Sequence, residues 1–147
     1  MIRDFQKSKV YKWENAAVSP KDVRKVPFEQ IQGLVDYIWA AEGLSHPPIV
    51  EFMHAGDKHS GKGCREFVSF PETGAKTWIV IHELAHAMNA DIDADNHSEN
   101  SDRHGPNFVG IYVDLLTKYL KIDMMYLLGS VRAHGVKINH GARPMMR

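Results

Sequence analysis

The sequence has little of what marks secreted, membrane-spanning or strongly nucleic-acid-binding proteins. It contains one cysteine, Cys64, which excludes an internal disulfide and fits a reducing compartment. No apolar run approaches the roughly 20 residues that cross a bilayer, and the N-terminal stretch MIRDFQKSKVYKWEN lacks the apolar centre of a signal peptide. The 18 Lys and Arg residues balance 18 Asp and Glu residues, so no overall basic field attracts nucleic acid. We therefore expect a soluble, cytoplasmic protein without a membrane partner.

The length of 147 residues fits one compact domain, and neither an internal repeat nor a linker divides residues 1–147. The tail after about residue 136 is basic, and we expect it to be loosely held. Its Lys137, Arg143 and Arg147 could touch phosphates, which keeps nucleic acid as a secondary hypothesis for a partner. The oligomeric state does not follow from the sequence.

Alternating element types predict an α+β fold. Apolar residues recur at helical spacing in residues 28–43, in residues 78–89 and again after Gly105-Pro106. Two β-like runs, IVEFMH and REFVSF, flank a glycine-rich turn, which predicts a hairpin or small antiparallel sheet. We expect this sheet to pack on the helix of residues 78–89, with the further helices around it.

The helix of residues 78–89 carries the motif HExxH. Residues four apart lie on one helical face, so His82 and His86 can bind a single Zn²⁺ ion. Glu83 lies one step round the helix, where it can accept a proton from a water molecule that the metal activates. A purely structural role, in which both imidazoles form hydrogen bonds in the core, is the alternative.

Two later histidines, His97 and His104, are candidates for the third ligand. We assign it to His104, because Pro106 can occupy the first turn of the following helix and so fix the backbone beside His104. His97 lies in the polar stretch DIDADNHSENSD, and ordering such a loop costs roughly 1 to 2 kcal/mol per residue.

The motif HExxH, followed by HGPNF at residues 104–108, resembles the SprT-like zinc metallopeptidase domain over residues 78–120. The resemblance implies a zincin-like fold with His82, His86 and His104 as zinc ligands and Glu83 as general base. RDFQKSKVYKWEN and SFPETG, taken with the motif, also look like a family of small bacterial and phage metallohydrolases, which is named for its metal motif. The interval between His86 and His104 is longer than in the SprT-like pattern, and Asn107 stands where an acidic residue is common.

Other metal-site patterns match less well. The metzincin spacing would place its glycine at Asn89 and its third ligand at Ile92, so it fails at both positions. Glu99 as a distal ligand is less favoured because it falls in the polar stretch. The acidic residues of the segment 91–102 follow an EF-hand frame only in part, since Asn96 replaces the turn glycine, and a solvated loop is the better interpretation than a calcium site.

The sequence thus favours a zinc-dependent hydrolase, most simply a metallopeptidase that acts on a protein or peptide substrate. REFVSF, as a sheet edge, would pair with an extended peptide. Two alternatives stay open. One is a non-proteolytic zinc hydrolase of a small amide, which a closed pocket would favour. The other is a binding or structural protein whose zinc staples the fold, which a closed site of four ligands would favour.

Overall fold

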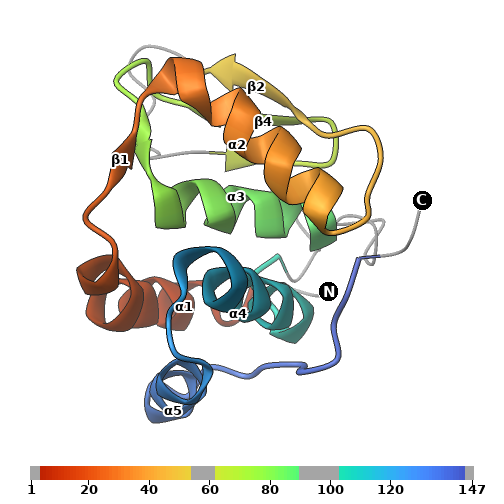
Figure 1. Cartoon of the computed structure of the whole chain (residues 1–147). Helices are drawn as coiled ribbons and strands as arrows, with labels where there is room; N and C mark the ends of the chain where they lie inside the picture. The colour runs from red at the N-terminus through yellow and green to blue at the C-terminus, as the bar shows by residue number, and fades with distance from the viewer. Residues whose placement is uncertain (1–3, 54–61, 90–102, 145–147) are drawn as a thin grey trace.

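The computed structural model describes residues 4–53, 62–89 and 103–144. Helix α3 (Thr77–Asn89) runs through the middle of the molecule (Figure 1). On one side of it lie α2 (Phe28–Ala41) and a small sheet, and on the other lie α1 (Lys7–Trp13) and α4 (Pro106–Leu120). This mixture of helices and small sheets confirms the expected α+β class.

Helix α3 is buried on both sides because other elements pack against each of them. Every residue from Val80 to Asn89 is buried, and the surrounding core contains Trp13, Trp39, Phe70 and Phe108. The strongly apolar composition of α3 fits this position, because a helix that is hydrophobic on all sides needs neighbours on all sides. Polar residues on such a helix need partners of their own.

The helix ends have identifiable stops and caps. α2 follows Pro27 and ends shortly before Gly43, which adopts a left-handed conformation with φ of 77°. α5 (Met124–Ala133) begins at Asp123, whose carboxylate accepts a hydrogen bond from the Tyr126 backbone N–H at 2.9 Å. The buried Asp22 serves α3 similarly, since its Oδ2 accepts a hydrogen bond from the Trp78 backbone N–H at 2.8 Å.

The predicted antiparallel hairpin is wrong. β2 (Ile49–Phe52) and β4 (Phe67–Phe70) pair in parallel, with Ile49 opposite Phe67. On its other side β4 pairs antiparallel with the short β3 (Lys62–Gly63). Parallel neighbours need a crossover of a dozen or more residues, and residues 53–66 are long enough for one, whereas a tight hairpin needs only a few. A separate antiparallel pair joins β1 (Lys25–Val26) to β5 (Ala75–Lys76).

The expected edge position of REFVSF is also wrong. The strand order is β2, β4, β3, so β4 lies in the middle of its sheet. Val68 and Phe70 are fully buried. Because both edges of β4 are already paired, its backbone has no free edge along which an extended peptide could bind. The prediction that residues 65–70 bind an extended substrate by strand addition is therefore wrong.

Helix α1 continues directly into a π-helical stretch, η1 (Glu14–Val18). A 3₁₀ turn, η2 (Ser19–Lys21), follows η1. The Trp13 indole N–H donates to the Ser130 hydroxyl of α5 at 2.8 Å. π-Helical turns occur often at functional sites. The stretch η1 begins at Glu14, whose side chain is buried at 3 % exposure.

The C-terminal segment was expected to be loosely held, whereas its described part, to residue 144, makes specific contacts. The Asn139 backbone N–H donates to the Pro106 carbonyl at 3.0 Å. A Cβ added at Gly110 would lie 2.0 Å from the Asn139 carbonyl oxygen, so α4 and this segment approach too closely for any side chain there. Val136 and Ala142 are buried. Among the described residues, no helix is long and apolar enough to cross a membrane.

Candidate metal centre

The structure brings His82, His86 and His104 together between α3 and the start of α4. Each contributes one ring nitrogen to a group in which these atoms lie within 4.8 Å of one another. The Nε2 atoms of His86 and His104 are 3.1 Å apart. Zinc–nitrogen bonds of about 2.0 to 2.1 Å in a tetrahedral site place ligand atoms about 3.3 Å apart. The spacing of these two nitrogens is therefore close to that of two ligands of one metal ion.

Two of the three imidazoles have a carboxylate on the ring nitrogen that faces away from the cluster. His82 Nδ1 donates to Glu14 Oε2 at 2.5 Å, and His104 Nδ1 donates to Asp4 Oδ2 at 2.6 Å. A carboxylate can only accept, so it fixes a proton on Nδ1 and leaves Nε2 as the nitrogen that can bind a metal when it carries no proton. This carboxylate–histidine pairing is typical of histidines that bind metals.

The backbone at His104 is held as firmly as its ring. Asp4 Oδ1 accepts from the His104 backbone N–H at 3.0 Å, and the Gln6 side-chain amide donates to the His104 carbonyl at 2.9 Å. Gln6 is 7 % exposed. The N-terminal segment therefore fixes both the position and the tautomer of the histidine that precedes α4.

Aromatic rings form the inner wall of the cluster. Phe108, which is fully buried, stacks on His86 at 4.3 Å between centroids and lies 5.1 Å from both His82 and His104. Tyr112 donates its hydroxyl to Glu14 Oε2 at 2.7 Å, so one carboxylate serves both His82 and Tyr112. This arrangement gives a physical reason for phenylalanine four residues after His104, because its ring excludes water from behind the imidazoles.

Tyr11 lies at the outer side of the cluster. Its ring is 5.2 Å from that of His104 and 39 % exposed, in contrast to the histidines, which are no more than 6 % exposed. Burial, and then the charges of Glu14 and Glu83, raise the pKa of Tyr11 to about 12. The phenol therefore stays neutral around pH 7.

Burial and charge act differently on the three histidines. Burial works to lower the pKa of His82, but Glu14 and then Glu83 outweigh it and raise that pKa to about 9. Burial, helped by the charges of His82 and His104, lowers the pKa of His86 well below its usual value. Burial also lowers the pKa of His104, although the hydrogen bond that its ring donates to Asp4 opposes this effect. His86 and His104 are therefore neutral at pH 7, as metal ligands must be.

Glu83 follows His82 on α3 and is also buried, at 7 % exposure. Its charge acts on His82, Tyr11 and Tyr112, which places the carboxylate in the same electrostatic environment as the cluster. A buried carboxylate beside three imidazoles is a suitable acceptor for a proton from a water molecule held there.

The residues present fit a zinc ion. The donors are imidazole nitrogens, which suit zinc and other late first-row metals, and two of them carry the carboxylate partners that such ligands usually have. Within residues 4–53, 62–89 and 103–144, the group contains three ligands and no fourth. Three protein ligands with one remaining coordination position are typical of catalytic zinc sites.

Sequence reasoning missed Asp4, Glu14 and Tyr112. For Glu14 a signal was present, since it lies four residues after Val10 and next to Trp13, on the buried side of its helix. A charged residue on an apolar helix face needs a buried partner. His97, Glu99 and the acidic segment 91–102, with its possible calcium site, lie outside the described residues.

Comparisons with family models, with curated proteins and with solved structures gave no match for this chain. The function of this chain is therefore inferred from the residues of the cluster themselves.

Proposed function

We propose that this protein is a zinc-dependent hydrolase that cleaves peptide bonds, with His82, His86 and His104 as zinc ligands and Glu83 as general base. The observation that carries the proposal is the meeting of three buried imidazoles from two elements, two of them with a carboxylate on Nδ1. The resemblance of residues 78–120 to SprT-like peptidases points in the same direction.

Each residue has a definite task in this reaction. A zinc ion, when bound, would supply Lewis acidity and lower the pKa of water from 15.7 to about 7. Glu83 takes the proton from the attacking water and passes it to the leaving amine nitrogen. Asp4 and Glu14 hold His104 and His82 in the tautomer that exposes Nε2. Phe108 keeps bulk water away from the inner side of the imidazoles.

The proposal is tested by metal analysis combined with cleavage profiling of a whole proteome. Protein purified without added metal should contain about one zinc per chain, and a chelator should remove both the metal and the cleavage. Absence of any stoichiometric divalent ion would contradict the metal site. Full zinc occupancy without any cleavage would favour a small amide substrate or a structural zinc instead.

Glu14→Gln should weaken zinc binding by roughly 10- to 100-fold, because the carboxylate that orients His82 loses its charge while the size of the side chain is kept. Competition with a chromogenic chelator measures the affinity. Glu29→Gln is the matched control, since Glu29 is an exposed glutamate of α2 outside the cluster. Equal affinities in the two variants would show that Glu14 does not orient a ligand.

Zinc binding should release about one proton at pH 7. The pKa of His82 is raised to about 9 in the metal-free chain, so at pH 7 its ring carries a second proton, on Nε2, that zinc must displace, whereas His86 and His104 are already neutral. Because protons compete with the metal, the apparent affinity should rise about tenfold per pH unit between pH 6.5 and 8. Calorimetric titrations in two buffers with different ionisation heats measure the release. An affinity that does not change with pH would contradict the protonated state of His82.

A further inference from the structure

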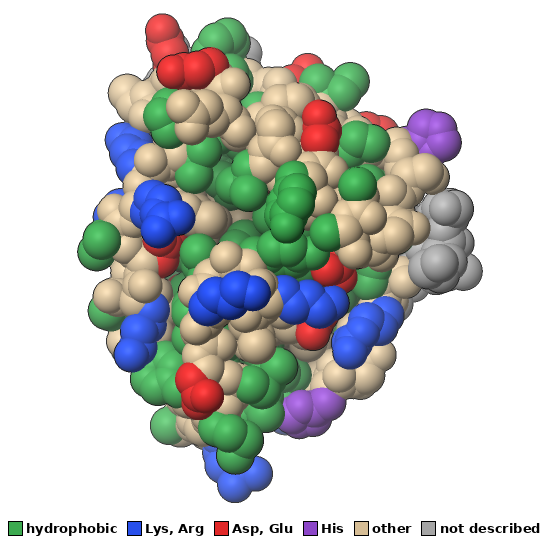
Figure 2. All heavy atoms as spheres, in the orientation of Figure 1, with side chains coloured by type: hydrophobic (Ala, Val, Ile, Leu, Met, Phe, Trp, Pro, Cys, Tyr) green, Lys and Arg blue, Asp and Glu red, His purple; other side chains and the backbone are tan. Residues whose placement is uncertain are grey.

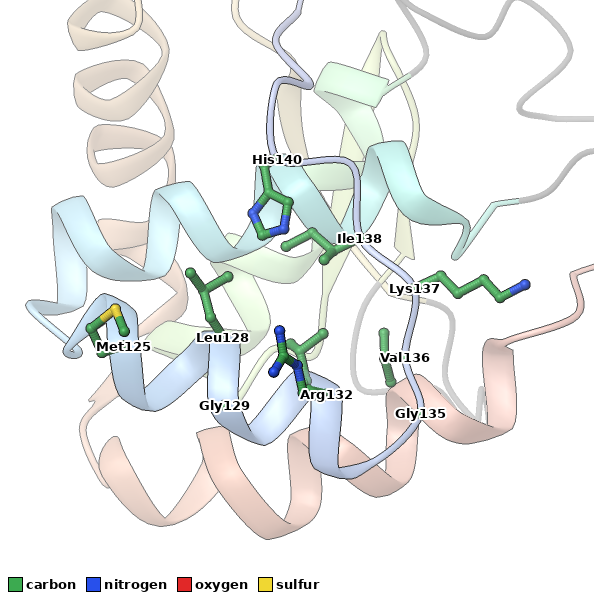
Figure 3. Close-up of a pocket in the computed structure, with 10 residues that line it drawn as sticks. Met125, Leu128, Gly129, Arg132, Gly135, Val136, Lys137, Ile138 and His140 are labelled. Atoms are coloured by element: carbon green, nitrogen blue, oxygen red, sulfur yellow. The ribbon is translucent and has the colours of Figure 1, made fainter.

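A cavity separate from the histidine cluster lies between α5 and the C-terminal segment (Figure 3). Its volume is about 550 Å³, and none of its lining residues belongs to the histidine cluster. We call it the α5 cavity. Small-molecule sites commonly have volumes of about 300 to 1,000 Å³, so the α5 cavity is large enough for a ligand rather than for a few waters only.

The walls of the α5 cavity are fixed by hydrogen bonds. The Gln6 side chain bonds both the N–H and the carbonyl of Lys137, at 2.8 and 2.9 Å. The Val136 backbone N–H donates to the Val131 carbonyl of α5 at 3.0 Å, and Asn139 is bonded to Pro106. The C-terminal wall is therefore tied to α5, α4 and the N-terminal segment, so a ligand would enter a preformed space and would not have to order it.

The residues that line the α5 cavity are partly apolar and partly basic. Leu128, Val131, Val136 and Ile138 supply the apolar surface. Arg132 from α5 and His140 from the C-terminal segment extend into the space from opposite walls (Figure 3). Basic and hydrophobic side chains also lie side by side on the face shown in Figure 2. No Asp or Glu is among the described residues that line the cavity, so Arg132 has no carboxylate partner within that lining.

We propose that the α5 cavity binds a small amphipathic acid, with its carboxylate between Arg132 and His140 and its aliphatic chain on the apolar wall. The planar guanidinium of arginine matches the two oxygens of a carboxylate, and the imidazole adds a second N–H donor. Lys137 also belongs to the lining, but its side chain extends away from Arg132 and His140 (Figure 3). One guanidinium and one imidazole therefore remain at the cavity, and they suit a singly charged group. The proposal does not depend on the proposed hydrolase activity.

Octanoate is the probe. It should bind with a dissociation constant on the order of 1 mM, and decanoate should bind about tenfold more tightly because two more methylene groups are buried. Octanol, which lacks the charge, should bind at least about tenfold more weakly. Chemical-shift changes of backbone amides should map to α5 and residues 135–140. Shifts that map elsewhere, or no saturable binding up to about 10 mM, would overturn the proposal.

Two pairs of variants test separately the positive charge of Arg132 and the open volume of the α5 cavity. Arg132→Met should weaken octanoate binding about tenfold or more, whereas Arg24→Met, at an exposed arginine outside the lining, should not change it. Gly129 lines the cavity and a Cβ there would meet nothing within 4 Å, so Gly129→Phe places a ring beside the cavity with no clash at its Cβ.

Gly33 of α2 is the matched control, because it also lies in a helix with open space around its Cβ. Gly129→Phe should abolish binding, and Gly33→Phe should leave it unchanged, with the melting temperature of each variant recorded to confirm folding. Octanoate binding that survives both Arg132→Met and Gly129→Phe would show that the α5 cavity is not the site.

Discussion

Glu83→Gln is expected to lower hydrolysis by about 100-fold or more while zinc stays bound and the fold stays intact. The amide has nearly the size of the carboxylate but cannot accept the proton of an attacking water. Glu83 is buried beside the histidine cluster without belonging to the three ligands, so its replacement leaves the nitrogen donors in place. Turnover is measured on a substrate found by cleavage profiling, and zinc content is measured on the same preparation.

Two results would contradict this role for Glu83. Unchanged turnover would show that Glu83 is not the base. Loss of zinc or of the folded state would show that its carboxylate is structural or a ligand. Glu29→Gln, at an exposed position of α2, should change neither turnover nor zinc content and serves as the control for a Glu-to-Gln change elsewhere.

Helices α2, α3 and α4 could be predicted from the sequence because their signals are local, whereas α1 was not predicted. Apolar spacing and Pro27 indicated α2, and Gly105-Pro106 indicated the start of α4. The meeting of His82 with His86 needs only the geometry of one helix. The prediction that His104 joins them depended on Pro106, which fixes the backbone beside it. The structure places His104 beside the other two imidazoles.

The sheet could not be predicted because its direction depends on how the chain returns between two strands. A glycine-rich connection of this length fits a hairpin and a crossover equally well, and the parallel pairing of β2 with β4 is decided by packing on α2 and α3. Asp4 and Glu14 were missed for a similar reason. Their partners, His104 and His82, lie 100 and 68 residues away along the chain.

The N-terminal segment therefore supplies hydrogen-bond partners to the histidine cluster, although no sequence motif marks it. Asp4, Gln6 and Glu14 all reach the cluster from α1 and the residues around it, and each forms a hydrogen bond with His82 or His104. Buried polar groups of this kind are costly unless they are paired. Three such groups gather around His82 and His104. Two histidines that lie four residues apart by chance would not have these partners.

His104→Ala is expected to lower zinc affinity by several orders of magnitude, because it removes one of three protein ligands. His97→Ala should leave affinity close to that of the parent, because the sequence places His97 in a polar stretch that is costly to order. The structure supports this assignment through the partners of His104: Asp4 binds both its ring and its backbone N–H, and Gln6 binds its carbonyl. These contacts hold the Nε2 atom of His104 3.1 Å from that of His86.

The measurement is a zinc titration of both variants against a competing chelator, with circular dichroism to show that each variant is folded. Loss of the buried pair between His104 and Asp4 also removes a structural contact, so folding must be checked independently of the metal. Asp4→Asn should have a smaller effect, because it keeps His104 as a ligand and weakens only the hydrogen bond that orients its ring. Its zinc affinity should fall by roughly 10- to 100-fold. If His97→Ala loses zinc and His104→Ala retains it, the cluster described here is not the metal site. The expected order of zinc affinity, from weakest to tightest, is His104→Ala, then Asp4→Asn, then His97→Ala.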